Sequence, residues 1–344
     1  MQFIKSDINI DFLGKQKIGF FFSCALIFAG LVSLIVHRGP NYGIDFAGGT
    51  LVQVKFTQAV DVGDIRSGLN DLGLKDASVQ GFGQSQDNEY LIRTSNSGDL
   101  KDNLEAAIVD GIQKSTTLTP EIRRVEMVGP QVGDDLKKKA LLAIFYSLLF
   151  ITIYISGRFE QKWTIAGITA GSLMTAVYFL SVFNVSMPFL IAAALAVSLA
   201  LFWTLKLQFA MGAIVALIHD VFITVGIFSL LDLDFSLPII AALLTIIGYS
   251  LNDTIIVFDR IRENIKGTDD KAAMPGLFNK SINETLSRTI LTSLTTLIVL
   301  LALFFLGGEI IHNFALAMII GVIIGTFSSI FVATPIVLAA QTKG

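Results

Sequence analysis

The sequence predicts a polytopic α-helical membrane protein with one folded α+β domain outside the bilayer. Of its 344 residues, 53% are hydrophobic and only 15% are charged, whereas a soluble protein carries about 25% charged residues. Eight apolar runs approach or exceed the length of about 20 residues that a helix needs to cross a bilayer. Between the first and second runs lies a stretch of about 95 residues with charges throughout, which is long enough to bury a core of its own.

The first span is expected at Ile18–Val36 and is expected to be retained. Lys15 and Lys17 precede this run, and His37-Arg38-Gly39-Pro40 follows it. A cleaved signal peptide would have a shorter apolar core and a cleavage site of small residues. Residues 1–37 therefore form an N-terminal segment and a first transmembrane helix.

Residues 38–137 are predicted to form an extracytoplasmic head domain with a ferredoxin-like fold. Thr50–Phe56 alternates as a strand does, and Val62–Leu72 has a helical period. The polar turn Gln84–Asn88 separates two further strands, which indicates a hairpin. The order strand, helix, strand, strand, helix, strand is that of the ferredoxin-like sandwich. The other expected elements are the strands Ala77–Gly83, Glu89–Thr94 and Glu121–Val128 and the helix Leu100–Lys114.

Residues 138–344 are predicted to form a bundle of about seven transmembrane helices. Segments on the side of the N-terminus carry Lys and Arg, whereas the later loops on the other side carry none. The positive-inside rule therefore places the N-terminus in the cytoplasm and the head outside. Lys137–Lys139 oppose this orientation, but they trail a folded domain that translocates regardless of charge. The expected spans are 139–157, 163–183, 188–206, 209–231, 237–258, 286–306 and 313–338.

The composition excludes several classes of function. The net charge is −3 and no basic stripe exists, so no nucleic-acid partner is expected. Cys24 is the single cysteine, so no intrachain disulfide and no cysteine metal site can form. His37, His219 and His312 lie far apart and show no metal-ligand spacing. No cofactor or metal is expected.

The main candidate for chemistry is Asp253, which lies with Asn252 in a polar cluster inside the apolar run 237–258. Asp253 is about four residues, or roughly 6 Å, from the end of that run. Ionisable groups within spans are costly and usually functional, so we predict a carboxyl group that exchanges protons. The alternatives are an interhelical hydrogen bond or a carboxylate that reaches the membrane surface. Arg288 opens the next span and is either a positive anchor or a fixed cation near Asp253.

Two further motifs have less certain roles. His219 and Asp220 are adjacent within one span, and because neighbouring helix residues point about 100° apart, we expect each to contact a different neighbour rather than to form one site. Helix–helix hydrogen bonding and proton relay are both open for this pair. The segment that joins the first span to the first head strand contains paired glycines, which permit positive φ. A strand follows these glycines, so we predict a structural joint rather than a phosphate loop; its residues are Asp45, Phe46, Gly48 and Gly49.

Taken together, six sequence motifs resemble those of the SecF family of bacterial protein-export subunits. The longest, Gly248–Asn264, is highly specific, whereas the Asp-Phe-x-Gly-Gly motif is shared with the sister SecD family. The others are Val128-Gly129-Pro130-x-Val132-Gly133, Gly212-Ala213-Ile214-x-Ala216-Leu217-Ile218-His219-Asp220, Ser287-Arg288-Thr289 and Gly325-x-x-Ser328-Ser329.

The resemblance implies an RND-like half of a transporter in the bacterial inner membrane. Members of the family pair with SecD, sit beside the SecYEG channel and use the proton gradient to help an unfolded polypeptide across the membrane. The intramembrane acid and arginine of the family fall on Asp253 and Arg288, and the motif also includes His219 and Asp220. The implied partners are therefore SecD, SecYEG, the translocating polypeptide and membrane lipids, with protons as the coupling ion.

One departure from the family pattern concerns the number of spans. Such members usually have six spans, and an Arg-Phe-Glu corner leads directly into the His-Asp span. Here Arg158-Phe159-Glu160 is followed by a span without that motif, which arrives only after a second corner at Leu205–Phe209. The pattern predicts an insertion of two helices at about 160–206, which preserves the orientation of everything that follows.

Three functions are compatible with these features. The first is a non-enzymatic, proton-coupled subunit of the protein translocase. The second is an RND-like exporter of small molecules or lipids, although one half-sized chain argues against it. The third is a membrane scaffold without ion coupling, in which Asp253 only joins helices. A membrane protease fits poorly, because no nucleophile lies beside a base in a recognisable motif.

Overall fold

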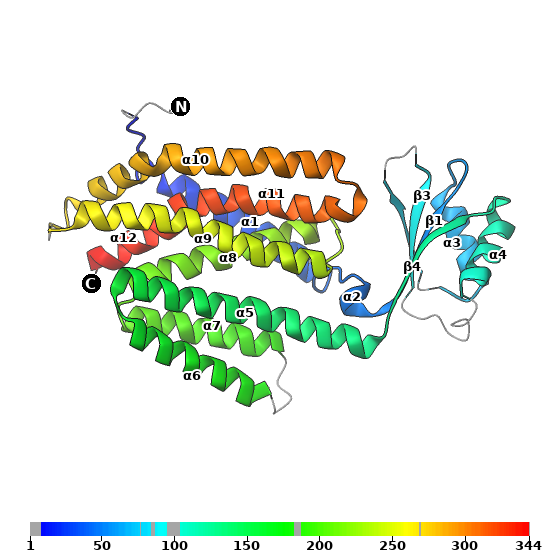
Figure 1. The fold of residues 1–344 in the computed structure, drawn as a ribbon, viewed down its shortest axis with the longest axis horizontal. Helices are drawn as coiled ribbons and strands as arrows, with labels where there is room; N and C mark the ends of the chain where they lie inside the picture. Colours follow the sequence, from blue (N-terminus) through cyan, green and yellow to red (C-terminus); the bar gives the residue numbers. More distant parts are fainter. Residues whose placement is uncertain are drawn as a thin grey trace.

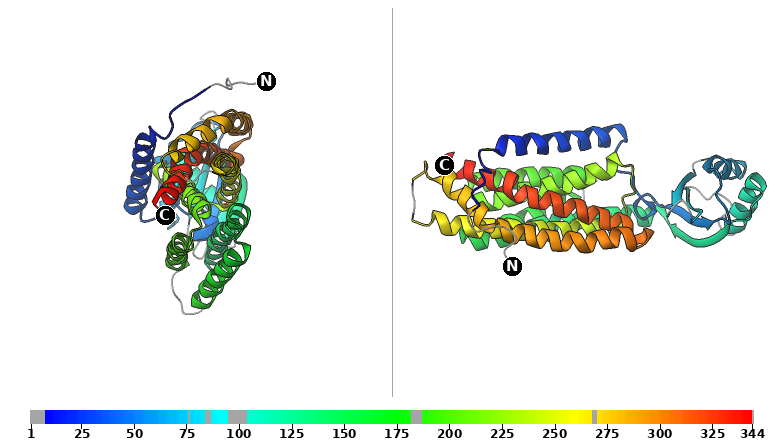
Figure 2. Two further views of the ribbon diagram at one scale, coloured as in Figure 1. Left: turned by 90° about the vertical axis from the view of Figure 1, so that its left-hand side faces the viewer. Right: turned by 90° about the horizontal axis from the view of Figure 1, so that it is seen from above.

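The chain folds into a helical bundle with a small α/β head domain at one end (Figure 1). A computed structural model describes residues 8–75, 77–83, 87–94, 104–181, 187–267 and 270–343. Helix α1 begins and helix α12 ends at the end of the bundle away from the head, which we call the terminus end (Figures 1 and 2). The other end, next to the head, is called the head end.

The head has the predicted ferredoxin-like fold. Its four strands form one antiparallel sheet in the order β2-β3-β1-β4, and α3 and α4 cover one face (Figure 1). Side chains alternate between buried and partly exposed along β1, so that Val52 and Val54 enter the core with Ile65, Ile92 and Ile108. The elements are β1 (Gly49–Lys55), α3 (Val62–Asp71), β2 (Ser78–Phe82), β3 (Glu89–Thr94), α4 (Leu104–Thr116) and β4 (Glu121–Val128). Residues 84–86 of the predicted hairpin turn and residues 100–103 of the predicted helix lie outside the described residues.

The bundle confirms the predicted class of polytopic membrane protein. In the described part of the chain, seven helical segments are long and apolar enough to cross a membrane. The eighth expected span is α7, whose 18 residues make a helix of about 27 Å, slightly shorter than the hydrocarbon core. Of the loop expected at 184–187 before α7, residues 184–186 lie outside the described residues. The helices are α1 (Gln16–Val36), α5 (Pro130–Glu160), α6 (Trp163–Ser181), α7 (Met187–Thr204), α8 (Gln208–Leu230), α9 (Leu237–Ile265), α10 (Met274–Leu306), α11 (Glu309–Ser328), the π-helical turn η2 (Ser329–Ala333) and α12 (Thr334–Lys343).

Helices α8, α9 and α11 form the centre of the bundle, and α1 and α10 lie at its edge. In the most apolar window of each helix, 61% of the residues are buried in α8 but only 17% in α10. Small residues bring α1 close to α8: a methyl group on Gly30 would lie 2.9 Å from Cα of Gly226. The hydroxyl groups of Ser33 and Ser229 are hydrogen-bonded across the same contact at 2.8 Å.

Helices α9 and α10 are longer than the apolar runs that predict them. Polar residues continue α9 as far as Ile265, so Asp253 lies twelve residues before the helix end and not the four predicted from hydropathy. Helix α10 likewise begins at Met274, twelve residues before its expected span.

Candidate functional site

Asp253 lies at the centre of the bundle, where α9 meets α10 and α11. Its side chain is fully buried, with 0% relative exposure. The hydroxyl groups of Ser293 on α10 and Thr326 on α11 lie 3.4 Å and 3.3 Å from carboxyl Oδ2. They lie closer to each other, at 2.6 Å, and because one of their two protons is used in that bond, only the other is left for the carboxylate. No group among the described residues bonds Oδ1, so Asp253 is held loosely for a buried acid.

The other residues predicted for this site lie near Asp253 but face outward. Arg288 is exposed on α10, five residues before Ser293, and no ion pair joins it to Asp253 in the described part of the chain. Asn252 is exposed on the outer face of α9. The arrangement therefore has a buried acid inside and an amide and a cation on the bundle surface.

His219 and Asp220 are hydrogen-bonded to each other, so the expectation that they do not form one site is wrong, whereas the expectation that each contacts a different neighbour is confirmed. The imidazole Nδ1 lies 2.9 Å from Oδ1 of its neighbour Asp220. The angle between Cβ directions does not prevent this contact, because the ring is large enough to turn along the helix toward the next side chain. Its Nε2 lies 2.9 Å from the hydroxyl of Ser23 on α1.

Both oxygens of Asp220 are bonded, in contrast to those of Asp253. Oδ2 accepts hydrogen bonds from Ser250 on α9 at 2.5 Å and from Ser328 on α11 at 2.9 Å. The carboxyl group, with 1% exposure, thereby joins α8 to both neighbouring helices. Sequence reasoning missed the hydroxyl partners of both acids, although Ser250 and Ser328 lie within the motifs quoted above.

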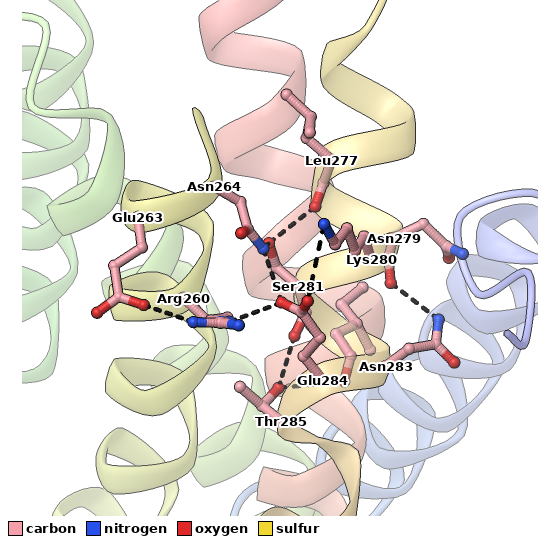
Figure 3. Close-up of polar contacts among 11 residues, drawn as sticks. Arg260, Glu263, Asn264, Leu277, Asn279, Lys280, Ser281, Asn283, Glu284 and Thr285 are labelled. Atoms are coloured by element: carbon pink, nitrogen blue, oxygen red, sulfur yellow. Dashed lines mark hydrogen bonds and ion pairs between the residues drawn. The ribbon is translucent and has the colours of Figure 1, made fainter. Parts of the chain in front are cut away.

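A polar network ties α9 to α10 at the terminus end, beyond Asp253 (Figure 3). Arg260 lies between two acids: its Nε donates to Glu284 at 2.6 Å and its Nη1 to Glu263 at 2.8 Å. Asn264 donates to Glu284 at 2.8 Å and to Ser281 at 2.9 Å. The two helices that carry Asp253 and Arg288 are thus fixed to each other at this end.

The N-terminal segment is attached to the same part of α10. Asn279 and Asn283, one turn apart, each use the side-chain amide to bond backbone groups of the segment. Both donate to the carbonyl of Ile10 at 2.9 Å, and they accept from the amides of Phe12 and Ile10 at 2.9 Å. This contact places the chain just before α1 against the start of α10.

The glycine-rich segment joins the head to the start of α9. Asp45, in the short helix α2 (Ile44–Ala47), accepts a hydrogen bond at 2.9 Å from the backbone N–H of Leu237, the first residue of α9. Gly48 has φ +72°, and a side chain there would lie 2.8 Å from Cα of Pro130, where α5 begins. Gly49 also has positive φ, at +116°. Phe46 is buried against Phe235 in the loop before α9.

Comparison with known proteins identifies the family. A family model described as "Protein export membrane protein SecD/SecF, C-terminal" matches residues 108–197 and 181–343, and one described as "SecD/SecF GG Motif" matches 33–60. The chain belongs to the SecD/SecF family. Protein translocase subunit SecF of Calditerrivibrio nitroreducens is 42% identical over 98% of this chain and 96% of the relative. The corresponding subunit of Thermodesulfovibrio yellowstonii is 40% identical over 96% of this chain and 94% of the relative.

Solved structures of the SecD/SecF family share the fold. The crystal structure of SecDF, a translocon-associated membrane protein from Thermus thermophilus, is 31% identical with a TM-score of 0.69. A second SecDF structure, in a super-membrane-facing form, is 33% identical with a TM-score of 0.60. Each comparison covers 98% of this chain but 39% of the solved chain, so this chain spans about two-fifths of their length. Together with its apolar helices, membership of the family makes the chain a multi-pass protein of the inner membrane.

The Arg-Phe-Glu corner packs against the His-Asp helix although two helices intervene in the sequence. Oε1 of Glu160 accepts a hydrogen bond at 2.9 Å from the backbone N–H of Phe209, near the start of α8. Phe159 stacks on Phe209, and Arg158 forms an ion pair with Asp259 of α9 at 2.6 Å. The corner therefore meets α8 as if the chain ran directly into it. The two matched segments of the SecD/SecF family overlap over 181–197, inside the predicted insertion.

Proposed function

We propose that this chain is a SecF subunit that works with SecD and uses the proton gradient to promote protein export. Its match to curated SecF subunits over nearly its whole length supports the assignment to protein translocation. The observation that carries the proton coupling is Asp253, a fully buried intramembrane acid with one oxygen that accepts no hydrogen bond from the described residues. Acids in such positions mark proton relays in pumps and transporters.

In the proposed mechanism, Asp253 takes up a proton in one state of the complex and releases it in another. Protonation removes the negative charge of the carboxyl group and so weakens the hydrogen bonding of Oδ2 with the hydroxyl groups of Ser293 and Thr326. These two residues lie on different helices, α10 and α11. Arg288 supplies a fixed positive charge that opposes protonation when it approaches and permits it when it withdraws. The pair His219 and Asp220 is the second proton-exchanging group of this proposal, and Asn252 orients the partner at the surface of α9.

The joint offers a route from the proton site to the head. Helix α9 carries Asp253, and its first residue, Leu237, is bonded to Asp45 beside the two glycines. Arg93 of the head sheet pairs with Asp234 in the loop before α9, with Nη1 2.9 Å from Oδ1. A movement of α9 therefore reaches the head through two polar contacts, and we infer that this movement acts on the translocating polypeptide outside the membrane.

SecD is the proposed partner for the outer face of α9 and α10. Asn252, Gly248 and Arg288 are exposed on this face, and a side chain on Gly248 would meet nothing within 4 Å in this chain. Polar groups that face lipid are costly, so another protein surface is expected to cover them. In the proposed orientation, the basic terminus end is cytoplasmic, the head is outside, and the assembled complex lies beside SecYEG.

Replacement of Asp253 by Asn tests the coupling. Asn is nearly isosteric but cannot take up a proton, so export driven by a proton gradient should fall at least tenfold while the complex with SecD still assembles. The matched control is Asp110→Asn, which makes the same substitution at an exposed position on α4 of the head and should leave export unchanged. Normal export by Asp253→Asn would refute proton coupling, and the chain would then be a scaffold without ion coupling. Failure to co-purify with SecD would refute the assignment to the translocase.

A further inference from the structure

An open groove runs along the outside of the bundle between α1 and the C-terminal segment formed by η2 and α12. Its volume is about 530 Å3, which is in the range of ligand sites. The π-helical turn η2 lies at this point, and the ring of Phe331 packs against Gly19 of α1, where an added Cβ would meet it at 2.6 Å. The lining residues used below are Lys17, Ser23, Cys24, His219, Val332 and Ala339.

The groove has the depth of one membrane leaflet. Its wall on α1 extends from Gln16 to Ile27, which is about 17 Å at 1.5 Å per residue. The hydrocarbon core of a bilayer is about 30 Å thick, so the groove reaches from one membrane surface to the midplane and no further. That length suits one acyl chain and is too short for a channel.

The chemistry of the lining favours hydrocarbon over water. Most of the lining is aliphatic or aromatic. The polar pair at its floor, Ser23 and His219, is already hydrogen-bonded at 2.9 Å. A water molecule needs two or more polar partners to stay in such a space, whereas apolar cavities remain dry.

The surface end of the groove carries a positive charge. Lys17 lines it and is exposed, and Lys15 is exposed two residues earlier, at the N-cap of α1. Neither lysine has an ion-pair partner among the described residues. An ammonium group at this level is placed to meet a lipid phosphate.

We propose that this groove binds one anionic phospholipid of the leaflet at the terminus end, with an acyl chain against η2 and α12 and its phosphate at Lys17. The bound chain covers the Ser23–His219 pair and keeps water from the Asp220 side of the bundle. The proposal goes beyond the proposed export function and does not depend on it, because lipid retention is measured without export.

The first test measures which lipids the full-length chain retains. The protein is equilibrated in vesicles of equal phosphatidylglycerol and phosphatidylcholine, and the retained lipid is counted by native mass spectrometry. Lys17→Gln should retain about fivefold less phosphatidylglycerol, which corresponds to about 1 kcal/mol. Lys206→Gln, which removes an exposed lysine at the α7–α8 corner away from the groove, should retain as much as wild type. Equal retention by both variants, or displacement of the lipid by inorganic phosphate, would overturn the proposal.

The second test asks whether the groove holds lipid or water. Ala339→Trp should fill it and reduce retention, whereas Ala176→Trp, on the exposed face of α6, should not. Cys24 is the single cysteine of the chain and lines the groove. In vesicles, a charged, membrane-impermeant thiol reagent should modify it at least tenfold more slowly than the thiol of Cys24→Ser/Lys206→Cys. Similar rates would show a water-filled groove and contradict lipid binding.

Discussion

Asp220 and Asp253 are both buried at the centre of the bundle, but their carboxyl groups differ in the number and length of their hydrogen bonds. Asp220 has contacts on both oxygens, to His219, Ser250 and Ser328, at 2.5 to 2.9 Å. Asp253 has only two contacts, at 3.3 and 3.4 Å, and one oxygen without a bond in the described part of the chain. A buried polar network whose hydrogen bonds are all satisfied is rigid. A buried acid that lacks hydrogen bonds is more often retained for a functional role than for stability.

The difference teaches how one bundle can combine stability with movement. The two acids use the same helices, because Ser250 and Asp253 are one turn apart on α9 and Thr326 and Ser328 are near neighbours on α11. The Asp220 network fixes these helices to α8. The longer Asp253 contacts hold α10, the least buried of the candidate spans after the head, less closely than the network at the terminus end does.

The largest expected effect is on stability, from replacement of Asp220. Asp220→Ala removes the acceptor for three buried donors, and breaking such a network costs about 3–5 kcal/mol. Asp253→Ala should cost less than about 1 kcal/mol, because Ser293 and Thr326 still bond each other. Denaturant unfolding of the purified protein in detergent measures both. A loss of stability in Asp253→Ala as large as that in Asp220→Ala would remove the distinction between the two sites.

The next effect concerns activity and sharpens the role of Asp253. Ser293→Ala combined with Thr326→Val removes both hydroxyl groups that contact the carboxyl group, at a cost of about 1–2 kcal/mol in stability. We expect proton-driven export in reconstituted vesicles to fall about tenfold, because the acid loses the contacts that link it to α10 and α11. The control is Thr295→Val, which removes an exposed hydroxyl group from α10. Unchanged export in the double variant would mean that Asp253 does not act through these helices.

The acids of this comparison could be predicted from the sequence, but their partners could not. An ionisable residue inside an apolar run can be identified from the sequence alone, and this pattern indicates Asp253, Asp220 and His219. Ser and Thr are common in membrane helices, and only the packing of α10 and α11 selects Ser293 and Thr326 from among them. The same holds for Ser23, which reaches His219 from a helix almost 200 residues earlier.

The fold shows the same division between local and non-local information. The strands β1 and β3 of the head were predictable because burial alternates along both, and the spans were predictable from hydropathy. The ends of α9 and α10 were not, because Arg260, Glu284 and their neighbours continue both helices with polar residues. Hydropathy detects where a helix leaves the lipid and not where it ends. The contact of Glu160 with α8 was equally hidden, because two helices separate them in the sequence.

Glu160 is intermediate between Asp220 and Asp253 in its hydrogen bonding, and its replacement is a third test with a smaller expected effect. One of its oxygens caps α8 at Phe209, and the other is buried without a hydrogen bond among the described residues. Glu160→Gln keeps the shape and an acceptor but removes the negative charge at the start of the helix, so we expect a loss of about 0.5–1 kcal/mol. Thermal unfolding in detergent measures the change, with Asp110→Asn on α4 of the head as an exposed control. If the two variants are equally stable, the corner does not hold α8 through this carboxyl group.

The smallest effect is expected from an acid in the head, where water replaces lipid. Glu89 on β3 accepts hydrogen bonds from Gln53 at 2.6 Å and Lys55 at 3.1 Å on β1. Burial opposes its charge, but these bonds and the Lys55 charge outweigh burial and hold the pKa of Glu89 below its ordinary value of 4.5. Because the folded pKa is the lower one, the stabilisation is present above about pH 4.5 and is lost as the pH falls through the folded value.

Hydrogen exchange of β1 and β3 in the full-length protein can measure this contribution. Glu89→Gln should lower the opening free energy that protects these amides at pH 7 by a few tenths of a kcal/mol, as is usual for an ion pair between partly exposed side chains. The difference between variant and wild type should shrink as the pH falls below 4.5, when both carry a neutral side chain. Arg123→Gln, which breaks a more exposed pair with Glu121, should change protection less. If the difference in protection between wild type and Glu89→Gln does not change with pH, Glu89 stabilises the head through packing and not through its charge.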